Sequence, residues 1–571
     1  MIPSREWSLR HLWTLMLVIF CFYLTVASSS SLWDRDEPRF ARAAVEMLHT
    51  GDYLVPTFNG NLRADKPPLV YWCMNPWLRW WGPTDLAVRM PSILGSLMMA
   101  LATFHIGRNL GGDRLGWRAL WLLMCMPIPI FMGTAATADG ILMAGVAVSL
   151  AVMVDRLTQG RKKSHFVFLA FALTWALLAK GPVGLAAFWM GTVFILIFGK
   201  DVLKWDRRWW GEAGAATLIA LIAFLAWGIP ANEQTGGELM QLGLGRHIFQ
   251  RISEPLESHG GSGLIGWITS MPFYLPVLLA GAAPVSALLI PGVFRRKKIS
   301  AGNQKTLLIL SALVIPVLVL MTLVATKLPH YILSSFPGVA VAGAWLWSSF
   351  VERDPQAWSS RSVRVGQGVT TLLLILLAIA WGFAVQQVSG SILLAIPAQV
   401  FLLAGAWSIL KWNPQVAFES WRAPGGSAVL VALGMAFILA GAGWLEPHCK
   451  VARPITEIID SSASPDSRAP VSSLGFFEPS LLFALNPPAV SGQQGLKELP
   501  LDSLGPWLQA DGSAWLISAV ETGEEDPVLT HPVLVQPEGQ PRVTKHWEKK
   551  IFNYSNGRWL EVSLWFRSSR G

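Results

Sequence analysis

The residues best suited to chemistry lie in two short stretches of the first polar segment. Residues 33–40 read WDRDEPRF and follow the first apolar run directly, whereas residues 65–72 read DKPPLVYW. Carboxylates can accept a proton, and arginine and lysine side chains can hold a phosphate. Because both kinds of group share one segment beside an apolar run, we expect chemistry on an anionic lipid at a membrane surface.

The composition is that of a polytopic membrane protein. Of the 571 residues, 52% are hydrophobic and only 14% are charged, and the mean hydropathy is +0.44. A soluble protein carries about 25% charged residues. The 29 tryptophans suit the two membrane–water interfaces, and the four cysteines form neither a zinc pattern nor a disulfide framework. The net charge of +9 comes largely from short loops, so no nucleic-acid partner is expected.

Apolar runs long enough to cross a bilayer predict about thirteen transmembrane helices. The expected spans are residues 12–28, 88–106, 117–133, 138–154, 166–180, 182–199, 213–230, 271–290, 306–325, 332–350, 367–386, 391–410 and 427–445.

Basic residues recur in alternate connections between these runs, and Arg5 and Arg10 precede the first run. The positive-inside rule puts such connections in the cytoplasm. We therefore predict a cytoplasmic N-terminus and outer-face loops at 29–87 and 231–270. If residues 1–28 were a cleaved signal peptide, one span fewer would remain and the first loop would stay on the same side. We prefer an uncleaved anchor.

The composition changes after residue 446. Residues 1–446 are predicted to form a transmembrane catalytic domain, and residues 447–571 a soluble α/β domain outside the cytoplasm, with strands near 514–518 and 559–565. That domain has no catalytic pattern, which leaves a lid, stabilising or acceptor-guiding role open. No Walker or Rossmann glycine pattern is present, and this argues against a nucleotide-sugar donor.

Spaced motifs, taken in order, resemble the aminoarabinose transferase family. They are DExRFA at 36–41, MLxxGDYLVP at 47–56, DKPPLxYW at 65–72, TADG at 137–140, AKGP at 179–182 and TKLPHYIL at 326–333. This family belongs to the GT-C superfamily of polyprenyl-phosphate-sugar glycosyltransferases, which includes protein O-mannosyltransferases. The resemblance covers roughly residues 10–350, and it implies thirteen spans with an extracytoplasmic soluble domain.

The resemblance also implies roles for single residues. Asp36 matches the family's catalytic acid position, and we expect it to act as the base on an acceptor hydroxyl, with Glu37 and Asp139 as further catalytic residues. The residues expected to bind the donor and its phosphate are Arg39, Lys66, Lys180, Lys327 and Tyr331.

Each of these positions has a plainer interpretation. Asp36 and Glu37 can form a structural ion-pair knot with neighbouring arginines, and Asp139 can cap a helix. Lys327 can extend from a helix end towards the membrane interface, and the turn at Lys180 can be purely topological.

The resemblance implies a zinc ion held by an acid before Lys-Pro-Pro and a later histidine, here Asp65 and His259. Closed zinc sites usually have four ligands, so a solvated loop histidine is the alternative, and no cofactor is required by the chemistry. The chain departs from the family pattern at Phe40, Asp65 and His330, which leaves the sugar and the acceptor open, aminoarabinose and lipid A included.

Together these features predict a glycosyltransferase on the outer face of a bacterial-type inner membrane. It would move a sugar from undecaprenyl phosphate to a lipid or other envelope acceptor, such as a lipid A-like glycolipid, among membrane lipids. A protein O-mannosyltransferase is an alternative that differs in its acceptor. A sugar-lipid transporter is another, but it should show internal repeats and paired broken helices, whereas the charged loop lies in one half of this chain.

Overall fold

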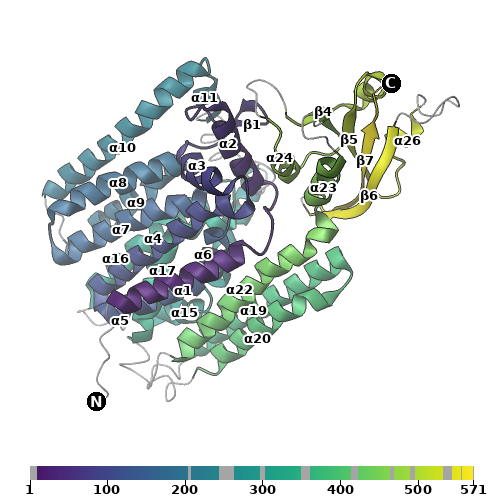
Figure 1. Cartoon of the computed structure of the whole chain (residues 1–571). Coiled ribbons are helices and arrows are strands. Elements are labelled where there is room, and N and C mark those ends of the chain that lie inside the picture. The colour runs from purple at the N-terminus through teal and green to yellow at the C-terminus, as the bar shows by residue number, and fades with distance from the viewer. Residues whose placement is uncertain are drawn as a thin grey trace.

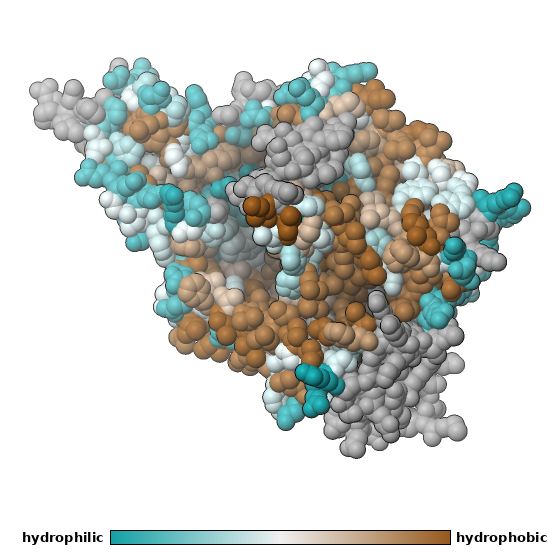
Figure 2. Space-filling view, turned by 180° about the vertical axis from the view of Figure 1, so that it is seen from behind, coloured by the Kyte–Doolittle hydropathy of each residue, from teal (hydrophilic) through white to brown (hydrophobic). Residues whose placement is uncertain are grey.

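The computed structural model describes residues 9–203, 207–243, 263–295, 303–348, 361–412, 422–462, 469–488, 495–531, 543–554 and 556–569. The chain forms a large helical bundle, and a smaller domain with a sheet lies beyond one end of helix α22 (Figure 1). Hydrophobic residues cover much of the visible side of the bundle, whereas hydrophilic residues gather over the sheet domain (Figure 2). This distribution is what a membrane domain joined to a water-exposed domain requires.

The helices of the bundle follow one another along the chain with short connections. They are α1 (Leu9–Ala27), α2 (Asp36–Thr50), α3 (Leu69–Trp81), α4 (Asp85–Gly111), α5 (Asp113–Cys125), α6 (Pro127–Gly133), α7 (Ala138–Gln159), α8 (Lys163–Lys180), α9 (Val183–Phe198), α10 (Arg207–Gln234), α11 (Glu238–Met240), α13 (Gly263–Ser270), α14 (Tyr274–Gly281), α15 (Ser286–Arg295), α16 (Gln304–Leu323), the 3-10 helix η6 (Pro329–Ser335), α17 (Phe336–Leu346), α19 (Arg361–Ser389), α20 (Ile396–Leu410) and α22 (Arg422–Cys449).

The predicted polytopic helical architecture is confirmed. Among the described residues, nine helices are long and apolar enough to cross a membrane, and a tenth span results if α5 and α6, bent by 68°, are taken together. The described part of each predicted span falls on helical residues, but α9, α14 and α17 are shorter than a full span. The count of thirteen therefore stays a prediction.

Small residues let α4 and α7 pack closely near the end that carries the polar loops. A Cβ atom on Gly95 of α4 would lie 2.2 Å from the carbonyl oxygen of Gly140 in α7, and one on Gly140 would meet Ser92. Such contacts bring membrane helices together without large side chains. They bring Arg89, near the start of α4, close to Asp139, in the first turn of α7.

The first polar loop is a structured unit outside the spans. After α2, a short hairpin pairs β1 (Thr57–Phe58) with β2 (Asn61–Leu62). Asn59 and Gly60 turn the hairpin with positive φ angles of 53° and 76°, as an Asn-Gly turn favours. Glu46 of α2 accepts hydrogen bonds from the Asn59 amide at 2.8 Å and from the Thr57 hydroxyl at 2.7 Å. This network ties the hairpin to α2.

The C-terminal domain has a mixed five-stranded sheet in the order β4-β3-β5-β7-β6. Strands β3, β4 and β5 are parallel, and β6 and β7 form an antiparallel hairpin beside β5. Both predicted strand segments lie in this sheet, in β5 and β7. Its elements are α23 (Ala452–Ser462), β3 (Val471–Leu474), α24 (Pro479–Leu485), β4 (Lys497–Leu499), α25 (Leu504–Gln509), β5 (Ala514–Glu521), α26 (Pro527–Thr530), β6 (Val543–Asn553) and β7 (Arg558–Arg567).

Candidate active site

A cavity of about 850 Å³ lies where the first polar loop, the ends of several spans and the C-terminal domain meet. One part is polar and is lined by residues 34–39, 63–66, Asp139, Lys180 and 330–331. The other part is apolar. Its lining includes Val26 of α1, Phe131 of α6, Trp381 of α19, and Ile438 and Leu439 of α22. A cavity with these two parts can hold a charged head group and part of a lipid chain at once.

Asp36 is the first residue of α2, and its side chain is exposed to the cavity. It makes no hydrogen bond or ion pair with any other residue in the described parts of the chain. Arg39, one turn further along α2, also lines the cavity and also has no such contact within the described ranges. A base and a phosphate-binding cation must both be available to a substrate, and these two side chains are.

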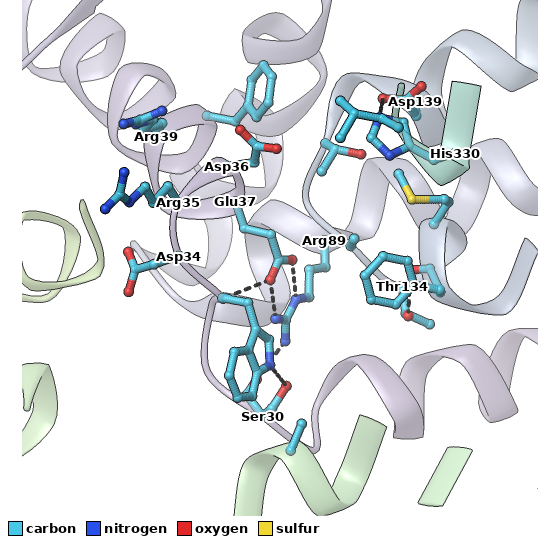
Figure 3. A pocket seen from close by; sticks show the side chains of 18 of the residues that line it. Ser30, Asp34, Arg35, Asp36, Glu37, Arg39, Arg89, Thr134, Asp139 and His330 are labelled. Atoms are coloured by element: carbon cyan, nitrogen blue, oxygen red, sulfur yellow. Dashed lines mark hydrogen bonds and ion pairs between the residues drawn. The ribbon is translucent and has the colours of Figure 1, made fainter. Parts of the chain in front are cut away.

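Across the cavity from Asp36 lies a cluster built from three distant segments (Figure 3). The Asp139 carboxylate receives Lys180 Nζ at 2.5 Å and lies 3.7 Å from His330 Nε2. Lys180 Nζ also lies 5.1 Å from the centre of the Tyr331 ring. The structure thus brings the predicted residues Asp139, Lys180 and Tyr331 together. His330, which the sequence marked only as a departure, lies between them, and burial lowers the pKa of its imidazole.

Glu37 has surroundings different from those of Asp36. It is buried, and Arg89 Nε and Nη2 donate to its two oxygens at 2.8 and 2.7 Å (Figure 3). The amides of Trp33 and Ala136 donate to it as well, at 2.8 and 2.6 Å. Burial by itself raises the pKa of Glu37, but Arg89 and these hydrogen bonds outweigh it and hold the pKa below its usual value.

The ion-pair interpretation of the two acids therefore fits Glu37 and does not fit Asp36. The partner is Arg89, which the sequence analysis did not single out, rather than Arg35 or Arg39. A signal was present, because a charged residue inside a predicted span is costly unless it is paired.

The 63–66 segment contributes further cations to the polar part. Lys66 Nζ donates to the backbone carbonyl of Asp65 at 3.0 Å and lines the cavity. Arg63, which no motif marked, is buried, pairs with the Asp65 carboxylate at 3.2 Å and donates to the Tyr71 hydroxyl at 3.1 Å. Its guanidinium lies 5.0 Å from the centre of the Phe40 ring.

Lys327 is placed differently from the prediction. Its side chain is buried, and Nζ donates to the carbonyl oxygens of Met321, Thr322 and Val324 at 3.1, 2.5 and 2.5 Å. Lys327 is not among the residues that line the cavity. It caps the C-terminal end of α16, where unpaired carbonyls and the helix dipole favour a cation.

The proposed zinc site has only one ligand in the described ranges. Asp65 lies in the cavity wall paired with Arg63, and His259 lies outside the described residues. Within the described ranges, no three His, Cys, Asp or Glu side chains form a group able to hold a metal. These residues do not fit a zinc ion, and no step below uses one.

Comparisons with known proteins agree with these observations. The family model for dolichyl-phosphate-mannose-protein mannosyltransferase matches residues 65–227. The undecaprenyl phosphate-alpha-4-amino-4-deoxy-L-arabinose arabinosyl transferase of Edwardsiella ictaluri is 28% identical over 422 residues, which cover 69% of this chain and 71% of the relative. A protein of the same name, numbered 2, from Sodalis glossinidius is 29% identical over 445 residues, covering 73% and 75%.

The fold also matches a solved structure over nearly its whole length. The crystal structure of ArnT from Cupriavidus metallidurans bound to undecaprenyl phosphate superimposes with a TM-score of 0.71 at 16% identity, covering 97% of this chain and 98% of the other. The fold and the relatives define a polytopic membrane glycosyltransferase of the GT-C class. Within that class the chain is aminoarabinose transferase-like, as its motifs predicted.

Proposed function

We propose that this protein transfers a sugar from undecaprenyl phosphate to a hydroxyl group of a lipid or other envelope acceptor. The observation that carries the proposal is the polar part of the cavity. There Asp36, a carboxylate with no described polar contact, lies with Arg39, Lys66 and Lys180, which come from three different segments. The relatives' names, which specify an undecaprenyl phosphate-linked sugar, support this choice of donor.

In the proposed reaction Asp36 acts as the base. Its carboxylate removes the proton from the acceptor hydroxyl, and the acceptor oxygen forms a bond to the anomeric carbon of the donor sugar. The bond from that carbon to the phosphate oxygen breaks, and its electron pair stays on the phosphate. A single base opposite the leaving group suits inversion at the anomeric carbon.

The cations stabilise the leaving group. The departing undecaprenyl phosphate gains negative charge, so donors aimed at its oxygens lower the barrier. Arg39 and Lys66 are assigned to this task. Lys180 supports it from across the cavity while it holds Asp139 in place. Lys327 is left out because its ammonium is committed to the end of α16.

The proposed location is the outer face of the inner membrane. The positive-inside pattern supports it, because it puts the cavity and residues 447–571 on the side opposite the basic connections. A lipid A-like glycolipid is one acceptor consistent with the apolar part of the cavity, which can take an acyl or prenyl chain.

Transfer by the reconstituted protein tests the proposal. Proteoliposomes would receive undecaprenyl phosphate-linked 4-amino-4-deoxy-arabinose, or the mannose-linked donor, together with an envelope lipid extract, and mass spectrometry would follow products. We expect one donor to give a glycosylated product and free undecaprenyl phosphate with the wild type, and neither to do so with Asp36→Asn. Equal product from both proteins would contradict the proposal.

A further inference from the structure

The segment that leads into Asp36 is held by the C-terminal domain. The hydroxyl of Tyr554, directly after β6, accepts from the Asp34 amide at 2.9 Å and donates to Asp34 Oδ2 at 3.3 Å. The amide of Ser480, in the first turn of α24, donates to Asp34 Oδ1 at 2.8 Å. Asp34 thus makes three hydrogen bonds to residues more than four hundred positions away in the sequence.

A second set of contacts holds the residues just before Asp34. The Trp33 ring packs against the Tyr554 ring with centres 5.2 Å apart. Lys450, which follows α22, lies on the Trp33 ring with Nζ 4.1 Å from its centre. Its ammonium also donates to the Ser31 hydroxyl and the Leu32 carbonyl, both at 2.8 Å. The chain is therefore gripped at successive residues from 31 to 34.

The membrane domain holds the same segment from the other side. Arg89 of α4 donates to the carbonyls of Ser30 and Ser31 at 2.6 and 3.0 Å, and the Trp33 amide donates to Glu37 at 2.8 Å. The path of residues 30–34 is therefore set jointly by α4 and by the C-terminal domain. Losing either set of contacts leaves the start of α2 less constrained.

Asp36 depends on this arrangement because it has no polar contact of its own in the described ranges. It follows Asp34 by two residues and begins α2, and Tyr554 itself lines the cavity. We infer that the C-terminal domain is part of the active site, and that Tyr554 is a positioning residue that fixes the Asp36 carboxylate through Asp34. This inference rests on the proposed function of Asp36 as the base.

The physical reason is the narrow geometric tolerance of the reaction. Reacting atoms must approach to about 3–3.5 Å, and a misplacement of about 1 Å costs roughly a hundredfold in rate. Substrate affinity depends on many more contacts, including those of Lys66 and Lys180, which lie on other segments. Loss of the Tyr554 hydroxyl should therefore lower kcat much more than it weakens donor binding.

The matched substitution is Tyr554→Phe, which keeps the ring against Trp33 and removes only the hydroxyl. With the donor–acceptor pair that gives turnover in the transfer assay, we expect kcat to fall by about tenfold. The Kd for undecaprenyl phosphate should stay within about twofold, and the melting temperature should not change. Tyr53→Phe is the control, since Tyr53 lies in the same loop, is 43% exposed and makes no described hydroxyl contact.

A second substitution keeps the test decisive. Asp34→Asn has only one acceptor oxygen for the two donors, so it should lower kcat like Tyr554→Phe, and the double variant should be no slower than the slower single one. Wild-type kcat in both single variants, or multiplied losses in the double variant, would overturn the inference. An active Asp36→Asn protein would instead remove the proposed function itself.

Discussion

Asp36 and Glu37 are adjacent in the sequence but face different surroundings. The Asp36 carboxylate is exposed to the cavity, whereas Glu37 is 5% exposed and receives four donors. A group that must take a proton from a substrate has to be accessible, and a group whose lone pairs are all occupied is a poor acceptor. The two acids are therefore expected to fail in different ways when they are changed.

Asp36→Asn should abolish turnover and leave stability unchanged, because the amide has nearly the same shape and is a far weaker base. The expected loss is about a hundredfold or more in kcat. Glu37→Gln should instead destabilise the protein, by about 3–5 kcal/mol, since Arg89 would keep a buried charge without its partner. Thermal unfolding in detergent beside the transfer assay separates the two. A Glu37→Gln protein of wild-type stability would refute the structural assignment.

Arg39 and Lys66 are expected to act on the donor phosphate. A hydrogen bond to a charged group contributes about 1.5–3 kcal/mol, so Arg39→Ala or Lys66→Ala should weaken undecaprenyl phosphate binding by about tenfold or more. Titration with undecaprenyl phosphate measures this. Arg79→Ala is the control, because Arg79 is an exposed cation of α3 and does not line the cavity. If both cavity variants bound the lipid as tightly as this control, the phosphate would lie elsewhere.

At the scale of elements, the junction between α24 and the first loop is sensitive to pH. Burial raises the pKa of Glu478, the residue before α24, from 4.5 to about 7, and the neighbouring Asp34 carboxylate adds to the effect while Arg35 and Arg39 oppose it. Burial also raises the pKa of Asp34. Folded Glu478 therefore keeps a proton that the unfolded chain has lost over the interval between these two values.

The sign of the pH dependence follows. Where the folded state binds more protons, stability falls as pH rises, so the stabilisation is complete below about pH 4.5 and is lost as pH rises through about 7. Melting temperatures across this range should decline more steeply for the wild type than for Glu478→Gln. Glu525→Gln, at an exposed position, should follow the wild type. Equal slopes for all three proteins would contradict the account of the junction.

The elements also show what a sequence can and cannot predict. Apolar runs are local, so every predicted span meets described helical residues, and the spaced motifs correctly marked Asp139, Lys180 and Tyr331 as neighbours in the cavity. Lys327 differs because its position is set by carbonyls at the end of α16, which no motif reports. The contact between Asp34 and Tyr554 spans 520 residues and depends on how two domains dock, which single-sequence patterns do not encode.

At the scale of the molecule, the account requires the cavity and the C-terminal domain to share one side of the membrane. The contacts of Asp34 with Ser480 and Tyr554 join them directly. Protease added to intact spheroplasts should therefore cut within residues 447–571 and spare the basic segment 295–298. Immunoblots with tags at each site would show this, and opening the cells should expose both. Protection of the C-terminal domain in sealed spheroplasts would mean that the predicted orientation is wrong.

The most direct test of the central claim is mass spectrometry of envelope lipids from cells. Three strains would be compared, with the wild-type protein, with Asp36→Asn expressed to the same level, and with no protein. The account predicts a glycosylated envelope component, heavier than its precursor by one sugar, only in the first strain, with the undecaprenyl phosphate-linked donor accumulating in the other two. The same envelope profile in all three strains, with no change in lipid-linked sugar, would contradict the claim that this protein is an undecaprenyl phosphate-dependent glycosyltransferase.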